Sequence, residues 1–494
     1  ATLRGLYGAS VEGTLTLSPL WWASGIAIAC AGTALAAASG LARVARMPPL
    51  APARPRAWAL AHDTAMRWQL SLAALCSIAA LAALILGGGL IGGFILLGGF
   101  LLAAALALPS VLALSLTLAA RFAKAPLTTW FWADTRQQLP GLSLALMALL
   151  LALSANIGVS TMVLSFRLTF TGWLDQRLVS DLYITVDPAE TARLQTYLEG
   201  RADAVLPIWH NEGDVLGAPA QIYGVVDHAV YVENRPLLSA LHNAWDTLAT
   251  GTGALVNEQL ARRENLSPGD SLPLPGGWET QIVGVYGDYG NPLGQVVIPL
   301  GALTEHYPDA DRSDFGVLTE APDVLRTALA EEFGLPEDAM IDQRALKAFS
   351  MQVFDRTFAV TGALNILTLS VAGIAILTSL LTLASMRLPQ LAPVWALGLT
   401  RATLARVELI RALILAGLTF LLALPVGLGL AWVLLAVINV EAFGWRLPMS
   451  LFPRDWLWLG LLSLAAAGLA SLWPARQLAK RPPADLIRVF SHER

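Results

Sequence analysis

The feature that most constrains this chain is the length of its uncharged runs. Residues 68–120 form 53 consecutive positions without Asp, Glu, Lys or Arg. A helix needs about 20 apolar residues to cross a bilayer, so this run is long enough for two crossings. Five other uncharged stretches are each long enough for one: 13–42, 137–166, 357–386, 412–440 and 456–475. The sequence therefore predicts an α-helical integral membrane protein with about seven spans.

Charge divides the chain into two chemically different parts. Only 14% of its residues are charged and 55% are hydrophobic, which excludes an ordinary soluble enzyme. Residues 168–354 carry 27 acidic and 10 basic side chains, a balance of −17, whereas the remainder carries 9 and 22, a balance of +13. An acidic soluble domain is therefore expected within a basic membrane frame. The basic residues lie at the ends of apolar runs, where they orient helices and do not indicate nucleic-acid binding.

The basic residues also predict the topology. Four segments, 43–67, 121–136, 387–411 and 476–494, together hold 17 bases and 5 acids. The positive-inside rule places such segments in the cytoplasm. The N-terminus and the acidic domain then lie outside, and the C-terminus lies inside.

The acidic domain has a mixed pattern that predicts an α+β fold. Helical spacing predicts helices at 188–201 and 322–333, and a helix from 342 to 356 is expected to run into the next span. A strand leading into a helix is expected over 254–265. Alternating residues predict further strands at 181–186, 221–227, 278–290, 295–299 and 315–320.

Catalytic and metal-binding patterns are not evident in this domain. Asp309, Asp311, Ser313 and Glu320 match four positions of an EF-hand loop, but Asp314 stands where that loop requires glycine. A solvated acidic turn is therefore expected there, and no catalytic or metal site is predicted. The sequence contains no G-x-x-x-x-G-K-[ST] phosphate-binding loop, so the chain is not expected to hydrolyse ATP itself.

Two short segments leave alternatives open. The glycines of 87–93 (GGGLIGG) could form a tight reversal between two spans or a small-residue face for helix packing. The basic elbow 387–400 presents Leu391, Val394 and Leu397 at helical spacing. It could dock in a groove on a cytoplasmic partner, or it could contact only lipid head groups.

The two ends of the chain resemble each other. An Ala-rich span near the start ends in GLARVARMPPLAP (40–52), and another near the end finishes in PARQLAKRPPADL (474–486). We interpret this as a duplicated module, as is frequent in transporters. The first repeat then contributes only its last span, so the chain is expected to be N-terminally incomplete.

Several motifs, taken in order, resemble the FtsX/MacB-like family of ABC transporter permeases, and double-module YbbP-like permeases most closely. RLPQLAPVWALG (387–398) is similar to the family's R-x-x-E-I-x-x-L-R-A-L-G elbow, although Gln390 stands in place of its Glu and prolines occupy 389 and 393. The segments 474–486 and 254–274 also resemble family signatures. The resemblance implies an extracytoplasmic α+β domain of the MacB/FtsX type and a bacterial inner-membrane location.

The resemblance also implies a domain organisation. It assigns 1–56 to the end of a first module, 57–136 to two central spans and linkers, and 137–167 to the first span of the second module. The periplasmic domain is then 168–354, and 355–494 is a three-span permease domain containing the elbow.

The function implied is that of the permease subunit of an ABC exporter. Its expected partners are an ATPase subunit, in two copies, which binds ATP and Mg, together with lipid and a hydrophobic or lipid-like substrate. The coupling residues implied by the elbow motif are Arg387, Gln390, Leu391, Val394, Leu397 and Gly398. The alternative is an ABC-coupled regulatory protein that controls a periplasmic or cell-wall partner.

Overall fold

The computed structural model describes residues 55–480 other than 290, 292, 397 and 399, together with 19, 22–27, 29–31 and 34. At 55–65, 382–396, 401 and several other helical positions it describes the backbone only. Of the predicted first span, 13–42, only the separate positions just named are described. The repeat ending at 40–52 lies outside the described residues, as do 481–486 of the second ending.

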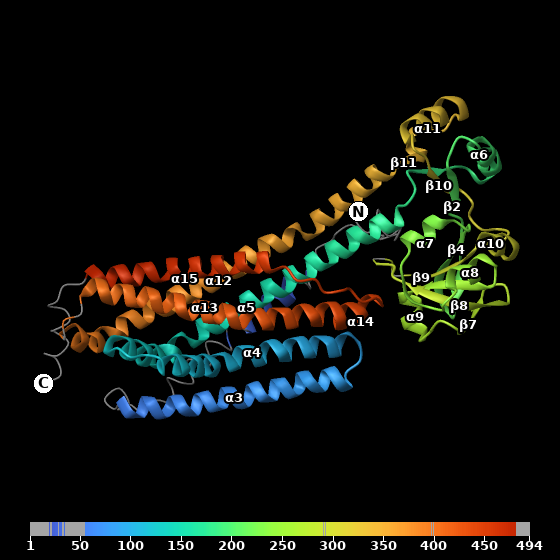
Figure 1. The fold of residues 1–494 in the computed structure, drawn as a ribbon. Coiled ribbons are helices and arrows are strands. Elements are labelled where there is room, and N and C mark those ends of the chain that lie inside the picture. Colours follow the sequence, from blue (N-terminus) through green and yellow to red (C-terminus); the bar gives the residue numbers. More distant parts are fainter. Residues whose placement is uncertain are drawn as a thin grey trace.

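Long helices form a bundle, and an α/β domain lies at one end of it (Figure 1). The bundle helices are α3 (Pro55–Leu86), α4 (Gly89–Ala120), α5 (Pro126–Arg177), α12 (Gln343–Ala396), α13 (Arg401–Val433) and α15 (Pro453–Lys480). A π-helical turn (Leu434–Ile438) and α14 (Asn439–Phe443) extend α13. Five helices of the described residues are long and apolar enough to cross a membrane; in α12, the described apolar stretch is the shorter Ile366–Leu381.

Both interpretations of the glycine segment 87–93 hold in part. Gly87 and Gly88 connect α3 to α4, and Gly89 has a φ of +76°, which favours glycine. Gly93 lies inside α4, where a Cβ would be 2.9 Å from a side-chain carbon of Ile438. The first glycines therefore make the reversal, and Gly93 allows α4 to pack closely against the end of α13.

Two helices continue from the bundle into the α/β domain without interruption. At about 1.5 Å per residue, the 52 residues of α5 and the 54 of α12 extend roughly 80 Å each, far beyond a bilayer core of about 30 Å. Between bundle and domain they are joined by stacked Phe170 and Phe354, with ring centroids 5.5 Å apart. Arg167 lies 3.2 Å from Asp355. The helix predicted to run from 342 into the next span is thus present.

A four-stranded antiparallel sheet receives both long helices. Its strands are β1 (Leu182–Thr185), β2 (Ala204–Pro207), β10 (Asp314–Leu318) and β11 (Met340–Asp342), in the order β11-β1-β10-β2. Helix α5 leads into β1, and β11 leads directly into α12. Because β1 pairs with β11, the ends of the two helices are held side by side.

A second, mixed sheet is inserted between β2 and β10. Its strands are β3 (His210–Val215), β4 (Ala218–Val225), β5 (Leu237–Ala240), β6 (Gly253–Asn257), β7 (Ser271–Leu274), β8 (Trp278–Tyr286) and β9 (Gly294–Pro299). The main order is β3-β4-β9-β6-β8-β5, with β7 paired to β8. Strands β6 and β9 are buried along most of their length, which explains their continuous apolar sequences.

Short helices cover the two sheets. They are α6 (Thr191–Leu198), α7 (Ala229–Asn234), α8 (Ala244–Ala249), α9 (Glu258–Glu264), α10 (Leu300–His306) and α11 (Pro322–Ala328), with further helical turns at Pro188–Glu190, Leu329–Phe333 and Glu337–Ala339. One apolar core joins side chains of both sheets, including Leu182, Ile222 and Phe315. Since α5 runs on to Arg177 and α12 begins at Gln343, the sheets and their helices occupy 178–342, within the predicted range 168–354.

Candidate coupling site

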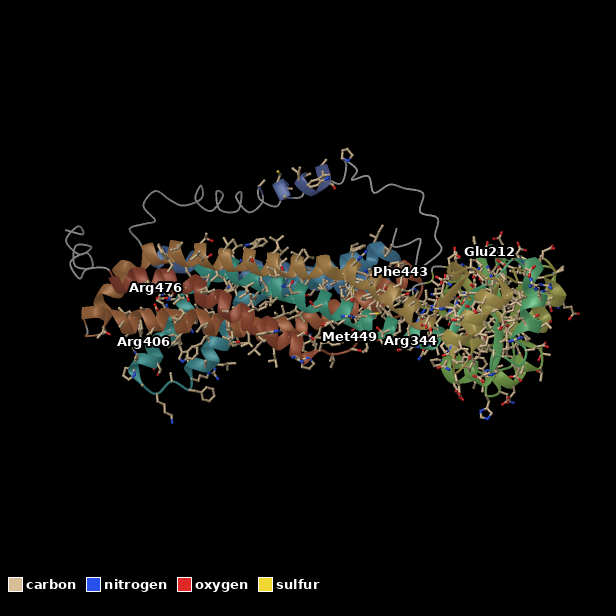
Figure 2. All side chains as sticks on the ribbon, turned by 90° about the horizontal axis from the view of Figure 1, so that it is seen from above. Glu212, Arg344, Arg406, Phe443, Met449 and Arg476 are labelled. Carbon is tan, nitrogen blue, oxygen red and sulfur yellow. The ribbon has the colours of Figure 1, made fainter. Side chains whose placement is uncertain are left out.

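The helix reversal between α12 and α13 is the centre of the candidate site. Helix α12 ends at Ala396, and Gly398 follows with a φ of +99°, in the left-handed region that favours glycine. The Thr400 side chain then accepts a hydrogen bond from the Thr403 N–H at 3.2 Å, which caps α13. Figure 2 shows Glu212 on the α/β domain, and Arg406 and Arg476 at the opposite end of the bundle. The reversal is therefore far from that domain.

The predicted elbow is mostly helical. The last turns of α12 contain Arg387, Gln390, Leu391 and Val394. The side chains of these four residues are outside the described part of the chain. Leu397 also lies outside the described residues, and Gly398 is exposed. The loop expected over 387–400 is thus helical as far as Ala396, and α13 begins at Arg401.

A buried ion cluster lies about three turns beyond the reversal. The Arg411 side chain on α13 is only 2% exposed. It donates to the Glu408 carboxylate at 2.8 Å, to the Thr135 hydroxyl at 3.0 Å and to the Asp134 carboxylate. Its guanidinium also lies over the ring of Phe131, 5.7 Å from the centroid. Because Asp134, Thr135 and Phe131 belong to α5, the cluster joins α13 to the start of α5.

Local sequence does not reveal this cluster. Arg411 is one of the basic residues of the segment 387–411, for which a cytoplasmic position was predicted, whereas its side chain is buried between helices. The partners on α5 are 276 and 277 residues away in sequence. The available signals were Asp134, an acid within the basic segment 121–136, and Glu408, three positions before Arg411.

Glycines bring the same two helices into close contact farther along. A Cβ on Gly158 of α5 would lie 1.8 Å from a side-chain carbon of Leu430, and one on Gly427 of α13 would lie 2.6 Å from the Cβ of Ile157. The Ser154 hydroxyl donates to the Ala423 carbonyl at 3.4 Å. Helices α5 and α13 are therefore joined by charge at the reversal end and by close packing in the middle of the bundle.

Other polar contacts between the bundle helices are simple hydrogen bonds. Asn156 on α5 accepts a hydrogen bond from the Thr368 hydroxyl on α12 at 3.0 Å. The Asn439 amide donates to the Trp445 carbonyl at 2.7 Å. The first of these bonds joins two bundle helices, as amide side chains in apolar helices commonly do, and the second is local to α14 and the loop after it.

The loop between α14 and α15 contacts the α/β domain. Trp445 is buried, stacks on Phe166 of α5 at 5.9 Å and meets Tyr289 of the domain edge-on at 5.8 Å. The Arg446 N–H donates to the buried Glu258 carboxylate at 3.3 Å. The domain is thus attached to the bundle by this loop as well as by α5 and α12.

Comparison with known proteins places the reversal in a recognised domain. Residues 362–483 match the family model described as FtsX-like permease C-terminal. That range contains the reversal, Arg411 and the whole of α15. A curated relative, an uncharacterized ABC transporter permease protein of Mycobacterium tuberculosis, is 28% identical over 374 residues. The match covers 70% of this chain and 43% of the relative, so the chain spans less than half the length of that protein.

Solved structures similar to part of the chain include domains of two transporters. The extracellular domain of a noncanonic ABC-type transporter, YknZ, from Gram-positive bacteria is 16% identical, covering 33% of this chain and 98% of that domain, with a TM-score of 0.25. The periplasmic region of MacB from Actinobacillus actinomycetemcomitans is 14% identical, covering 34% of this chain and 90% of that region, with a TM-score of 0.27.

The family match includes the helix reversal, the helix that bears the buried arginine and the helix that follows it. With the related ABC transporter permease and the apolar helices of the bundle, it agrees with the family predicted from the sequence. The chain thus contains an FtsX-like permease C-terminal domain and is similar to an ABC transporter permease.

Proposed function

We propose that this chain is the membrane subunit of an ATP-driven exporter of the mechanotransmission type. A separate ATPase, in two copies, binds ATP and Mg and presses on the cytoplasmic reversal. The resulting motion reaches the extracytoplasmic α/β domain, which extracts or expels a hydrophobic or lipid-like molecule. The C-terminus lies on the cytoplasmic side in this proposal, as the basic residues of the tail suggest.

The observation that carries the proposal is the continuity of α5 and α12. Both helices run from the bundle into the first sheet without a linker, so movement of one end is transmitted to the other. Arg411 supports this view, because it attaches the helix that begins at the reversal to the start of α5. A displacement of the reversal therefore acts on α12 directly and on α5 through α13.

The ATPase contact is proposed at the last turns of α12. Leu391 and Val394 lie three positions apart in a helix, so they share one face, and an apolar pair so placed fits a groove on a partner. Gln390, in place of the family Glu, implies that this contact depends less on ion pairing.

Purification of the full chain in mild detergent, with its bound proteins identified by mass, tests the first step. We expect an ATPase subunit in two copies. The double substitution Leu391→Ala and Val394→Ala should keep the complex but reduce substrate-stimulated ATP hydrolysis at least ten-fold. Leu457→Ala, at an exposed position of α15, is the control and should leave stimulation unchanged.

Two outcomes would contradict the proposal. If a folded, monodisperse sample contained no ATPase, the chain would lack the partner that the proposed ATP-driven transport requires. Hydrolysis that responds only to an external protein, and never to an amphiphile, would instead favour the regulatory role.

A further inference from the structure

A second charged cluster lies where α5 enters the α/β domain. We call it the arginine–tyrosine nest, and its members are Arg177, Tyr183, Tyr223, Tyr231, Arg235, Tyr286 and Asp288. Arg177 is the last residue of α5, Arg235 directly follows α7, and α7 contacts α5. Figure 1 shows α7 beside this end of α5. The nest therefore lies at the face of the domain that is turned toward the bundle.

Most polar groups around Arg177 are hydrogen-bonded to one another, although Asp288 Oδ1 is buried without a hydrogen-bond partner. Its guanidinium donates to the Gln295 side-chain oxygen at 3.2 Å, and the same oxygen accepts the Tyr286 hydroxyl at 2.6 Å. Asp288 is nearly inaccessible, and one of its oxygens lies 3.8 Å from Arg177. Its other oxygen accepts the Asn291 amide at 2.8 Å. Asp288 therefore balances the charge of Arg177.

The charge of Arg235 is not balanced by a neighbouring carboxylate in this way. One terminal nitrogen of its guanidinium is buried without a hydrogen-bond partner. The guanidinium lies over two aromatic rings, 5.0 Å from the centroid of Tyr286 and 5.8 Å from that of Tyr231. Within the described part of the chain, it has no carboxylate within ion-pair distance. Burial, together with repulsion from Arg177, lowers the pKa of Arg235.

The nest therefore holds two guanidinium groups and one carboxylate. A buried cation without a counter-ion is unfavourable, because the desolvation of the charge is not repaid by a partner. The tyrosines supply neutral hydroxyls at the same place, since burial raises the pKa of Tyr183 to about 12 and also raises that of Tyr231. Arg235 and the three tyrosines other than Tyr286 are only partly buried, so the nest is open at its edge. This is the environment that an oxyanion requires.

An aromatic column connects the nest with the bundle. Phe166, Phe170 and Trp173 follow one another along α5, with successive centroids 5.9 and 5.7 Å apart. Trp173 then lies under the Arg177 guanidinium, at 6.0 Å. Aromatic side chains of this kind favour the boundary between apolar and wet surroundings. Phe170 is buried against Phe354, whereas Trp173 is partly exposed beside Arg177. An apolar tail next to a bound head group would therefore meet Trp173, so a ligand with a charged head and an apolar tail fits this place better than a free ion does.

We propose that the nest binds the phosphate or carboxylate head group of an anionic amphiphile, with the unpartnered Arg235 as its principal donor. The head group would supply the missing negative charge and accept hydrogen bonds from Arg235 and the tyrosine hydroxyls. The choice of an amphiphile rests on the proposed export function; the oxyanion chemistry rests on the nest alone.

This binding is measured by titrating the full chain, in non-ionic detergent, with dodecyl phosphate. The rise of its thermal unfolding temperature with ligand concentration gives the affinity. We expect dodecyl phosphate to bind at least ten-fold more tightly than inorganic phosphate. Arg235→Gln should weaken dodecyl phosphate binding at least ten-fold, and Arg235→Lys, which keeps the charge, should weaken it less. Arg193→Gln is the matched control, because Arg193 is an exposed arginine of the same domain that already pairs with Glu190.

Each remaining outcome decides one part of the proposal. Equal affinity of the unmodified chain and Arg235→Gln would overturn the site. Equal affinity for dodecyl phosphate and inorganic phosphate, lost in Arg235→Gln, would overturn the amphiphile and leave an anion site. Arg235→Gln removes an unpaired buried charge and should fold, and its thermal transition without ligand verifies this. The titration needs no ATPase, so its result is independent of the complex tested above.

Discussion

Single residues decide how the bundle is held together at the reversal end. Arg411 is the largest fully buried side chain of the described residues, and its charge is shared between Asp134 and Glu408. A buried ion cluster gives little net stability compared with an apolar core, but removing one member leaves the others uncompensated. The cluster therefore fixes how α5 and α13 meet more than it stabilises the fold.

We expect Arg411→Gln to destabilise the protein by about 3–5 kcal/mol, because Asp134 then loses its buried cation. The thermal transition in detergent measures the loss. Arg406→Gln on the same helix is the control, since Arg406 is exposed, and it should change stability by less than about 0.5 kcal/mol. Equal transitions for the two variants would show that the cluster does not hold α5 and α13 together.

Elements as a whole were predictable where their pattern was strong. The strands expected at 181–186, 221–227 and 295–299 are present as β1, β4 and β9, and their apolar alternation or continuous burial made them visible. Strands β2, β3, β5, β7 and β11 were missed, and β3 and β5 show why. β3 has the sequence HNEGDV and pairs only with β4, while β5 forms the opposite edge of the sheet. Edge strands bury little, so their sequences show no clear apolar pattern.

The candidate site was predictable only in its position along the chain. The basic reversal is read from local sequence, because positive residues between two apolar runs have one topological meaning. Arg411 and Asp134 meet only once α5 packs on α13, and the nest needs residues from α5, α7 and both sheets. Such clusters depend on tertiary packing, which neither spacing nor composition records.

The packing of α5 against α13 can be tested with two glycines of the same helix. Gly158→Ala should destabilise the bundle by about 1–3 kcal/mol, because the new Cβ meets Leu430 and the backbone of Gly427. Gly172→Ala, where a Cβ meets no atom within 4 Å, should be neutral or stabilise the helix by up to about 1 kcal/mol. Urea or thermal unfolding of the two variants measures the difference. Similar effects at both positions would mean that close α5–α13 packing is not required.

At the scale of the whole molecule, the α/β domain is attached at three places. Helices α5 and α12 enter its first sheet, and the loop carrying Trp445 and Arg446 reaches Tyr289 and Glu258. None of these attachments is a flexible linker, since two are continuous helices and the third is a buried aromatic contact. The domain and the bundle are therefore expected to move in a correlated way.

We expect an interruption of α12 above the bundle to break this correlation. Gln352→Pro, at an exposed position of the helix, removes one backbone hydrogen bond and kinks the chain. ATP should then no longer change the distance between spin labels at Glu212 and Leu457, although the ATPase remains bound. Gln352→Ala keeps the helix and serves as the control. An undiminished distance change in Gln352→Pro would show that α12 does not carry the motion.

The pairing of β1 with β11 gives this arrangement a mechanical character. Leu182 lies opposite Asp342 in the ladder, and the Gln343 N–H donates to the Asp181 carbonyl at 3.1 Å, so the tips of the two long helices form a common pivot. The roughly 23 residues of α12 before Ile366 make an arm of about 35 Å, and a tilt of about 10° at its base would sweep the pivot by about 6 Å. Because the β1–β11 pairing prevents the domain ends of α5 and α12 from sliding past each other, an unequal axial shift of the two helices would rotate the whole α/β domain. In the proposed mechanism, a small displacement at the helix reversal would therefore become a larger displacement of the α/β domain.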